Sequence, residues 1–368
     1  FGTFTDDMGI VRYASNNVPR FDHDPTTGES LGLLIEEART NLFKYSEEFD
    51  NSGWSKTRVT VTANSIIAPD KTLTADKIIE DVTSSQDHIL VRQATSSVAT
   101  YTYSFFAKAG ERSHIRVSRA TGNQTVFTHY YTLENNGTTT GGGNITAYPN
   151  GWYRCYGQIV VNTAGAAGFA IRLENSSTNS IYNGDGTSGI YLWGAQYEQG
   201  SFATSYIPTY GGTVTRAADF ATIKGTNFTD FYNQDEGTIT TSTNSLNTSS
   251  TQYPLVIEGD VSNNERHLFA ESSAYQYQIK DGGTTTAQID AGQINPSKNI
   301  IAAAYKLNDV AVSLNGSNVA TDTSATMPTC NKLKLGHWST TNYSGHLMQV
   351  KYYNKRLPNA QLQGLTQQ

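Results

Sequence analysis

Short segments in which apolar and polar residues alternate recur along this chain, and turns rich in glycine and asparagine separate them. Arg58–Thr62 and Ser113–Ser118 show the alternation, with an apolar side chain at every second position through most of the run. Such alternation is typical of a strand with one buried face, because successive side chains of a strand point to opposite faces. The turns include Asn136-Gly137, Asn150-Gly151 and Asn183-Gly184, and both residue types tolerate a positive φ. The sequence therefore predicts an all-β protein built from sandwiches of the jelly-roll type, with little helix.

The length of the chain and one segment near its middle predict two sandwich domains in tandem. A chain of 368 residues exceeds one ordinary hydrophobic core. Tyr191–Tyr210 reads as the last strand of a sandwich followed by an exit through a Gly-Ser turn and a proline, and Gly211-Gly212 opens a linker. The predicted parts are an N-terminal attachment segment, a first sandwich, a linker and a second sandwich: residues 1–45, 46–208, 209–236 and 237–368.

Three short segments lie outside this pattern. Residues 32–43 have apolar side chains at spacings that fit either a helix face or strand alternation, and so short a run does not decide between them. We favour an extended chain laid against a sheet. Pro358–Leu365 is predicted as a short helix, because proline is common at the first position of a helix. The first residues, Phe1-Gly-Thr-Phe4, match neither a signal peptide nor a start methionine, so we expect sequence upstream of Phe1.

Composition limits the partners that we expect. Charged residues make up 16% of the chain, the formal net charge is −6, and no run of Lys and Arg occurs, so nucleic acid is a poor candidate partner. No stretch approaches the ~18 apolar residues that a membrane span needs, so membrane insertion is not expected. Cys155 and Cys330 lie far apart and are expected to be buried free thiols, which suits folding in a reducing cytoplasm.

A search for catalytic motifs favours a protein without covalent chemistry. The sequence holds no His-Glu-x-x-His pair and no phosphate-binding loop pattern. Gly184–Gly189 matches the letters of the dinucleotide-binding fingerprint, but it precedes a strand instead of following one, so we interpret it as a loop. The members of the pairs Glu36/Glu37 and Glu47/Glu48 are adjacent, so on a strand they point to opposite faces and do not jointly flank a glycosidic bond. We therefore expect no enzyme activity and no cofactor.

Several segments resemble known families. Gly32–Leu42 resembles a segment common in tail-fibre-like and other virion surface proteins of bacteriophages. Tyr101–Gly110, Asn150–Arg154 and Leu192–Gly200 together resemble the jelly roll of carbohydrate-binding modules, which would occupy residues 46–208. Gly345–Thr366, with residues 305–316 before it, resembles a concanavalin/laminin-G-like sandwich, which would occupy residues 237–368. The resemblances cover nearly the whole chain.

The resemblance implies a non-catalytic bacteriophage appendage protein that recognises glycans on the host surface. It would be made in the host cytoplasm, assemble as a homotrimer, contact other virion proteins and lie on the surface of the phage particle. Two alternatives stay open: a purely structural decoration of the capsid or tail, and an accessory carbohydrate-binding part of a polysaccharide-degrading enzyme. A fold resemblance alone does not decide between them.

Aromatic side chains are the candidate glycan contacts, because the apolar C–H faces of a sugar stack on an exposed Trp or Tyr ring. Trp54 and Trp338 are predicted to lie in loops, where binding residues concentrate, although each ring has the alternative of capping the edge of a core. Four further candidates are expected to line one face of the first sheet: Tyr101, Tyr103, His129 and Tyr131. With Trp54 and Trp338 they make six candidate glycan contacts. Trp152 and Trp193 alternate between apolar neighbours and are predicted to be core.

Jelly rolls of the resembled type often carry one structural calcium ion. Glu47 and Glu48 at the start of the first sandwich, and Glu198 at its end, are the candidate ligands. The alternative is that all three are ordinary solvated carboxylates, since acidic side chains are mostly exposed.

Overall fold

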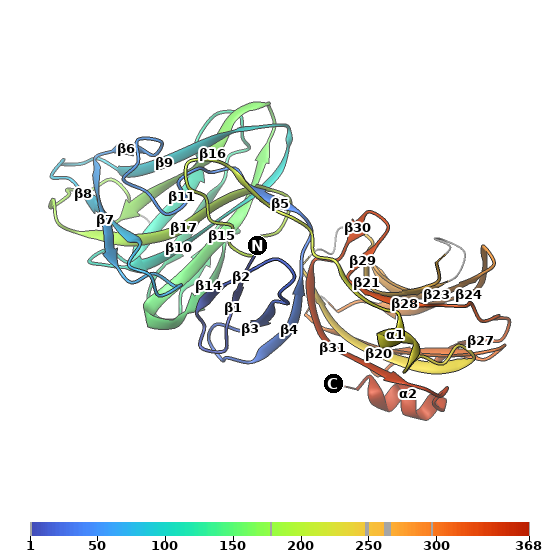
Figure 1. Ribbon diagram of the computed structural model, residues 1–368. Helices are drawn as coiled ribbons and strands as arrows, with labels where there is room; N and C mark the ends of the chain where they lie inside the picture. Colours follow the sequence, from blue (N-terminus) through green and yellow to red (C-terminus); the bar gives the residue numbers. More distant parts are fainter. Residues whose placement is uncertain (1, 177–178, 247–249, 261–265, 296, 368) are drawn as a thin grey trace. The chain divides into compact units, whose positions relative to one another are not determined.

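The structure is a computed structural model, and it describes residues 2–176, 179–246, 250–260, 266–295 and 297–367. The chain divides into two compact units (Figure 1). Unit 1 comprises Phe1–Glu29 and Ala38–Ala217, and unit 2 comprises Ser30–Glu37 and Ala218–Gln368. The chain thus passes from unit 1 to unit 2 and back before it enters unit 2 for a second time. Antiparallel strands make up most of the regular structure, which confirms the all-β prediction.

Unit 1 contains two six-stranded sheets. Sheet A has the order β14-β15-β10-β17-β8-β7 and sheet B the order β13-β12-β11-β16-β9-β6. The strands of sheet A are β7 (Val59–Ile66), β8 (Ala75–Glu80), β10 (Ala99–Ala109), β14 (Asn144–Tyr148), β15 (Trp152–Val161) and β17 (Gly189–Gln199). The strands of sheet B are β6 (Ser55–Thr57), β9 (His88–Ser96), β11 (His114–Arg119), β12 (Thr128–Thr132), β13 (Thr138–Thr140) and β16 (Gly165–Glu174).

Shorter strands complete unit 1. The hairpin β1 (Gly2–Thr5) and β2 (Val11–Ala14) and the pair β5 (Arg39–Asn41) and β18 (Val214–Arg216) form two-stranded sheets. Strand β3 (Phe21–His23) also belongs to unit 1. A 3-10 turn, η1 (Pro149–Gly151), joins β14 to β15.

The main core of unit 1 lies between sheets A and B. Alternate residues of β10, namely Tyr101, Tyr103 and Phe105, face it from sheet A. Phe169 and Ile171 of β16 face it from sheet B. Both sets are buried, as the period-two pattern requires for strands that share one core.

A second, smaller core covers the opposite face of sheet A. Phe106 of β10 and Trp193 of β17 point to this face and pack against Val11 of the N-terminal hairpin and Tyr206 of the segment after β17. Sheet A is therefore covered on both faces, and the first residues of the chain supply part of the cover.

Unit 2 also contains two large sheets. Sheet C has the order β19-β28-β21-β22-β23-β24, and sheet D contains β27-β26-β25-β20-β31-β4. The strands of sheet C are β19 (Ala221–Lys224), β21 (Gln252–Glu258), β22 (Arg266–Glu271), β23 (Ala274–Asp281), β24 (Thr284–Gln293) and β28 (Lys332–Leu335). The strands of sheet D are β4 (Ser30–Ile35), β20 (Glu236–Ser245), β25 (Asn299–Lys306), β26 (Val310–Leu314), β27 (Ala320–Asp322) and β31 (Gly345–Tyr353). The hairpin β29 (His337–Trp338) and β30 (Thr341–Asn342) and the helices α1 (Thr226–Thr229) and α2 (Asn359–Leu365) complete the unit.

The core of unit 2 lies between sheets C and D, with Phe269 and Tyr277 from one sheet and Ile301 and Tyr305 from the other. Helix α2 packs on the outer face of sheet D through the buried side chain of Leu362. The predicted helix at Pro358–Leu365 is confirmed, with Pro358 at its N-cap position. Among the described residues, no helix has the length and apolar character that a membrane span requires.

The N-terminal attachment segment predicted at residues 1–45 does not exist as a separate part. Residues 1–29 belong to unit 1, whereas β4 is a strand of sheet D in unit 2. Leu33 of β4 pairs with Leu347 of β31, and Ile35 pairs with Gly345. The extended conformation favoured for this segment is confirmed. Apolar side chains such as Ile35, which is 2% exposed, explain why the segment joins a sheet instead of remaining free.

Residues 209–236 are also structured, where the sequence predicts a linker. In unit 1, β18 pairs with β5, and in unit 2, β19 pairs with β28. Strands of three or four residues carry too little alternation to be recognised in the sequence.

Candidate functional site

Trp54 does not present its ring to solvent. The indole is 1% exposed, and it packs against Phe43 and Phe49 with ring centroids 5.7 and 4.7 Å away. The indole N–H donates to the Tyr45 carbonyl oxygen at 3.0 Å. The prediction of a sugar-stacking loop tryptophan is wrong for Trp54, because the loop folds back and inserts the ring into the edge of the core.

The four candidates predicted on one sheet face do converge, but the face is the inner one. The Tyr103 hydroxyl lies 2.6 Å from His129 Nδ1 and 2.7 Å from the Tyr131 hydroxyl, and Tyr101 stacks on Tyr197 with centroids 4.9 Å apart. All four are buried between sheets A and B. Burial raises the pKa of Tyr103 well above its usual value and lowers the pKa of His129, so both stay neutral. These side chains form a buried hydrogen-bond network that is closed to a ligand, so their prediction as glycan contacts is wrong.

Trp338 keeps part of its surface. It is half-buried in the β29–β30 hairpin of unit 2, and its ring meets Tyr253 edge to face with centroids 4.9 Å apart. Its neighbour His337 makes a similar contact with the exposed ring of Phe220. Trp338 therefore stays a predicted glycan contact, in a small aromatic surface cluster.

The three calcium candidates do not form one open oxygen site. Glu198 is fully buried, and its carboxylate accepts hydrogen bonds from the Thr204 N–H at 2.9 Å and from the Thr204 hydroxyl at 2.6 Å. Glu47 is buried and accepts from the Tyr206 hydroxyl at 2.8 Å, whereas Glu48 is half-buried. Over the described ranges, no group of three or more His, Cys, Asp or Glu side chains is placed to hold a metal ion.

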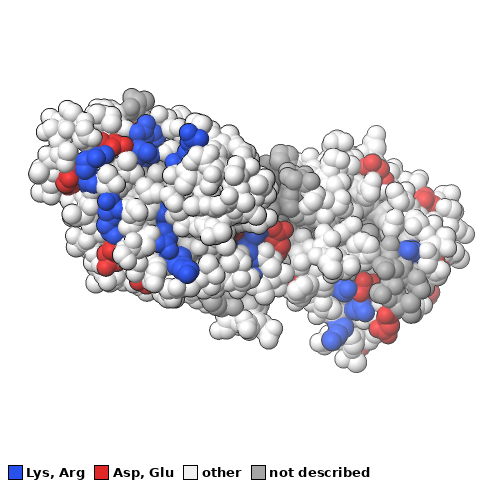
Figure 2. All heavy atoms as spheres, turned by 90° about the horizontal axis from the view of Figure 1, so that it is seen from above, with Lys and Arg blue, Asp and Glu red and all other residues white. Residues whose placement is uncertain are grey.

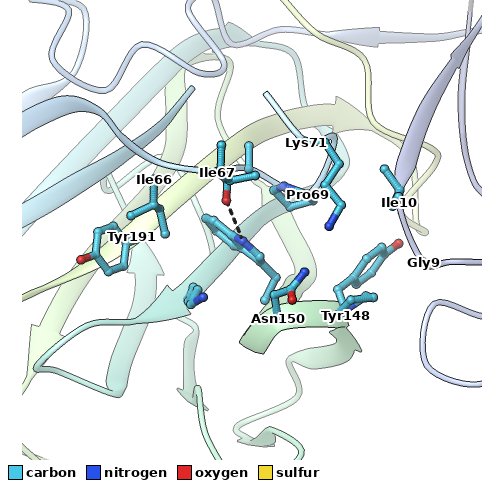
Figure 3. Close-up of a pocket in the computed structure, with 13 residues that line it drawn as sticks. Gly9, Ile10, Ile66, Ile67, Pro69, Lys71, Tyr148, Asn150 and Tyr191 are labelled. Atoms are coloured by element: carbon cyan, nitrogen blue, oxygen red, sulfur yellow. Dashed lines mark hydrogen bonds between the residues drawn. The ribbon is translucent and has the colours of Figure 1, made fainter. Parts of the chain in front are cut away.

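A cavity of about 270 Å³ opens in unit 1 at the outer face of sheet A. Side chains that point outward from β10, β14, β15 and β17 form its floor, and the loops around residues 9–10 and 67–71 form its walls. The lining residues are Gly9, Ile10, Ile66, Ile67, Ala68, Pro69, Lys71, Lys108, Tyr148, Pro149, Asn150, Trp152 and Tyr191. In Figure 3, Tyr191 lies at one end of this pocket and Gly9 and Ile10 at the other, with Lys71 and Asn150 between them.

The tight turn η1 shapes one side of the pocket. Asn150 adopts a φ of 60°, a left-handed conformation that asparagine tolerates better than most residues. The turn directs the chain into β15, where Trp152 is 2% exposed and forms the floor. The Trp152 indole N–H donates to the Ile67 carbonyl oxygen at 3.2 Å and so joins the floor to the opposite wall (Figure 3).

The other walls depend on two further left-handed residues. Gly9 has a φ of 71°, and a β-carbon there would lie 2.5 Å from both the Pro149 ring and the Pro25 carbonyl oxygen, so only glycine fits. Lys71 has a φ of 73° in a turn whose Lys71 N–H donates to the Ala68 carbonyl oxygen at 3.0 Å. This turn holds the Lys71 side chain at the rim.

The pocket combines aromatic surface with cations. Tyr148 and Tyr191 supply two partly exposed rings beside the buried Trp152, and Lys71 and Lys108 supply two ammonium groups for which the described part of the chain shows no hydrogen bond or ion pair. No acidic side chain lines the cavity among the described residues. The pocket therefore offers flat apolar surface and hydrogen-bond donors to a small neutral or anionic molecule.

Sequence reasoning found little of this pocket. The prediction that Trp152 is core is confirmed, but Tyr148, Tyr191 and the two lysines went unrecognised. One signal was present: Lys108 lies two positions after Phe106 and so shares its outward face of β10. The loops that cover this face come from distant parts of the chain, and alternation within one strand does not show them.

Comparisons with known proteins give only remote structural likeness. No family model matches the chain, and no curated protein matches it. The Ruminococcus gnavus IT-sialidase CBM40 domain matches at 15% identity and a TM-score of 0.33, over 37% of this chain and 84% of that chain. A native heptameric SAP-like pentraxin from Limulus polyphemus matches at 12% identity and a TM-score of 0.30, over 36% of this chain and 69% of that chain. The Streptococcus pneumoniae NanB sialidase K499G mutant matches at 14% identity and a TM-score of 0.34, over 39% of this chain and 26% of that chain. Likeness at this level carries no argument about what this chain binds.

Proposed function

We propose that this protein binds glycans without acting on them chemically, and that the pocket of unit 1 is a saccharide site. The observation that carries the proposal is the convergence of two partly exposed tyrosine rings, two lysine ammonium groups and the Asn150 amide on one cavity. A sugar requires both kinds of surface, because its C–H faces are apolar and its hydroxyl groups need hydrogen-bond partners.

The dimensions and charge of the pocket restrict the kinds of sugar that it can bind. A cavity of about 270 Å³ lies just below the usual range for small-molecule sites, so it accommodates a terminal sugar or a disaccharide end better than the middle of a long chain. Among the described residues, the charged groups that line it are Lys71 and Lys108, which favour neutral or acidic sugars over cationic ones.

We infer further that the glycan lies on a bacterial host and that the protein is a bacteriophage appendage. The resemblance of Gly32–Leu42 to phage virion surface proteins supports this inference. In that setting the protein would be a homotrimer on the particle surface, in contact with other virion proteins. Several weak sites per particle would then hold the virion by avidity.

The test of the saccharide site is a glycan array that includes neutral and acidic glycans, followed by titration of the best ligand. Tyr191→Ala should weaken binding roughly tenfold, because it removes about 1.4 kcal/mol of apolar contact. Tyr210→Ala is the matched control, since Tyr210 is 67% exposed and does not line the pocket. Equal affinity in the two variants would exclude the pocket as the site.

The remaining outcomes separate the alternatives. An absence of any glycan signal, together with an ordered position of the chain in an intact particle, would favour a purely structural decoration. Release of reducing ends from a polysaccharide would show an enzyme. A monomer at high concentration in a mass measurement would contradict the trimer.

A further inference from the structure

A row of four side chains crosses the outer face of sheet B, on the other side of unit 1's main core from the pocket. In the strand register Tyr130 of β12 faces Arg116 of β11, Arg116 faces Arg172 of β16, and Arg172 faces Ile89 of β9. The strand neighbours of these residues belong to the core between the sheets, so the row points outward. All four side chains are half-buried. We call this set the arginine row.

The arginine row places two like charges directly opposite each other. Such a cross-strand pair is destabilising unless an anion compensates it. Glu174 and Asp87 compensate in part: Arg116 Nε lies 3.3 Å from a Glu174 carboxylate oxygen, and Arg172 Nε lies 3.4 Å from an Asp87 carboxylate oxygen. Asp87 is shared with Arg58, which also forms an ion pair with it. Three guanidinium groups thus meet two carboxylates.

The surface of unit 1 around the arginine row is also positively charged. Figure 2 views unit 1 from the side on which β6, β9 and β16 lie in Figure 1. Lys and Arg side chains gather on this face, and the acidic side chains are sparser there (Figure 2). A positive face draws anionic ligands towards it.

Glu174 is an incomplete partner for the arginines. Its side chain is 1% exposed, and within the described part of the chain neither of its carboxylate oxygens accepts a hydrogen bond. Burial raises the pKa of Glu174 to about 7, even though the nearby charges of Arg116 and Arg172 lower it. Because Arg58, Arg116 and Arg172 share only the two carboxylates of Asp87 and Glu174, the guanidinium groups are left short of counter-charge.

We propose that the arginine row is a second ligand site and that it binds a carboxylate-bearing saccharide. Arg116 and Arg172 already contact Glu174 and Asp87 and donate to the hydroxyls of Ser180 and Ser118, and their remaining N–H groups match the oxygens of a carboxylate. The Tyr130 ring and the Ile89 side chain flank the pair and contact the apolar faces of the sugar. An acidic sugar unites both features in one molecule, whereas a free anion uses only the arginines.

Calorimetric titration of the full chain with trigalacturonate tests the proposal. Trigalacturonate should bind, and its affinity should fall as salt is added, because screening weakens interactions between exposed charges. Galactotriose, acetate and a sulfated galactose trisaccharide should bind at least roughly tenfold more weakly. Equal binding of the neutral trisaccharide or of acetate would overturn the proposed saccharide carboxylate, and equal binding of the sulfated sugar would overturn its selectivity.

Variants locate the binding. Arg116→Gln and Arg172→Gln should each weaken trigalacturonate binding roughly tenfold, because a hydrogen-bonded ion pair is lost. Arg119→Gln removes one positive charge from the exposed end of β11, the strand that carries Arg116, and should change affinity by less than about twofold. Full affinity in both row variants would refute the site. If Arg172→Gln does not fold, Arg172→Lys keeps the charge and must still weaken binding, because the planar fork is gone.

The proposals for the two sites of unit 1 can be refuted independently of each other. Tyr191→Ala lies on sheet A and should leave trigalacturonate binding at the arginine row unchanged if the array ligand occupies only the pocket. Loss of trigalacturonate binding in Tyr191→Ala, with full binding in Arg172→Gln, would assign the acidic sugar to the pocket and overturn the second site.

Discussion

Glu271 of unit 2 allows a sharp prediction about stability and pH. Its side chain is 2% exposed at the end of β22. The carboxylate accepts hydrogen bonds from the Asn299 amide at 3.1 Å and from the Thr243 hydroxyl at 3.4 Å, and neither donor is charged. The nearby hydroxyls of Tyr275 and Tyr343 are buried as well. Burial raises the pKa of Glu271 from its ordinary value of 4.5 to about 7.

The sign of the effect follows from where the proton is held. Between pH 4.5 and about 7 the folded protein keeps the Glu271 proton, whereas the unfolded chain has lost it. The contribution of this group to stability is therefore fully present below pH 4.5 and is lost as the pH rises to about 7. At roughly 1.4 kcal/mol per pH unit, the loss is about 3 kcal/mol. The Glu271→Gln side chain is neutral at every pH, so this variant should not lose stability as the pH rises. Its amide can donate a hydrogen bond to the Thr243 hydroxyl.

The measurement is hydrogen–deuterium exchange in graded urea, read by mass spectrometry on peptides of unit 2. At pH 8, Glu271→Gln should raise the free energy of unfolding of unit 2 by about 3 kcal/mol, and at pH 4 it should equal the wild type. Asp235→Asn is the control, because Asp235 is an exposed carboxylate of the same unit and should shift stability by less than about 0.5 kcal/mol at either pH. A pH-independent difference between Glu271→Gln and wild type, or a loss of stability at pH 8, would refute the reasoning.

Two further predictions follow from burial. Trp54→Ala should destabilise unit 1 by about 3–5 kcal/mol in urea unfolding, because the ring is 1% exposed and its removal leaves a cavity; a cost below about 1 kcal/mol would show that the ring is not part of the core. Cys155 and Cys330 should not react with a thiol reagent until the protein unfolds, since both are buried and burial raises the pKa of the Cys155 thiol; rapid labelling of native protein would contradict their placement.

The strand pattern is the part of the fold that sequence reasoning reaches. Tyr101–Gly110 reads as a strand and covers most of β10, and the alternation of Ser113–Ser118 covers most of β11. The path of the chain between the two units cannot be predicted in this way. The residues of β4 are few, and their place beside β31 depends on a partner more than 300 positions away. Local periodicity carries no information about such pairing.

Sequence reasoning missed the burial of the aromatic candidates for a related reason. Alternation assigns Tyr103 and Phe106 to opposite faces of sheet A, but it does not show that both faces are covered. The face that carries Tyr101 and Tyr103 packs against sheet B, and the N-terminal hairpin and the segment after β17 cover the opposite face, which carries Phe106. The hydroxyls of Tyr103 and Tyr131 hydrogen-bond to each other, which satisfies both groups inside the core.

The arginine row shows why a site made by a sheet is harder to find than one made by a motif. In the sequence Arg116 and Arg172 are separate residues in alternating segments, and each looks like an ordinary solvent-facing side chain. They become a pair only because β16 lies between β11 and β9, an order that does not follow the chain. The register then adds Tyr130 on one side and Ile89 on the other. A like-charge pair at that place costs stability, and Glu174 and Asp87 offset only part of that cost because Arg58 shares Asp87.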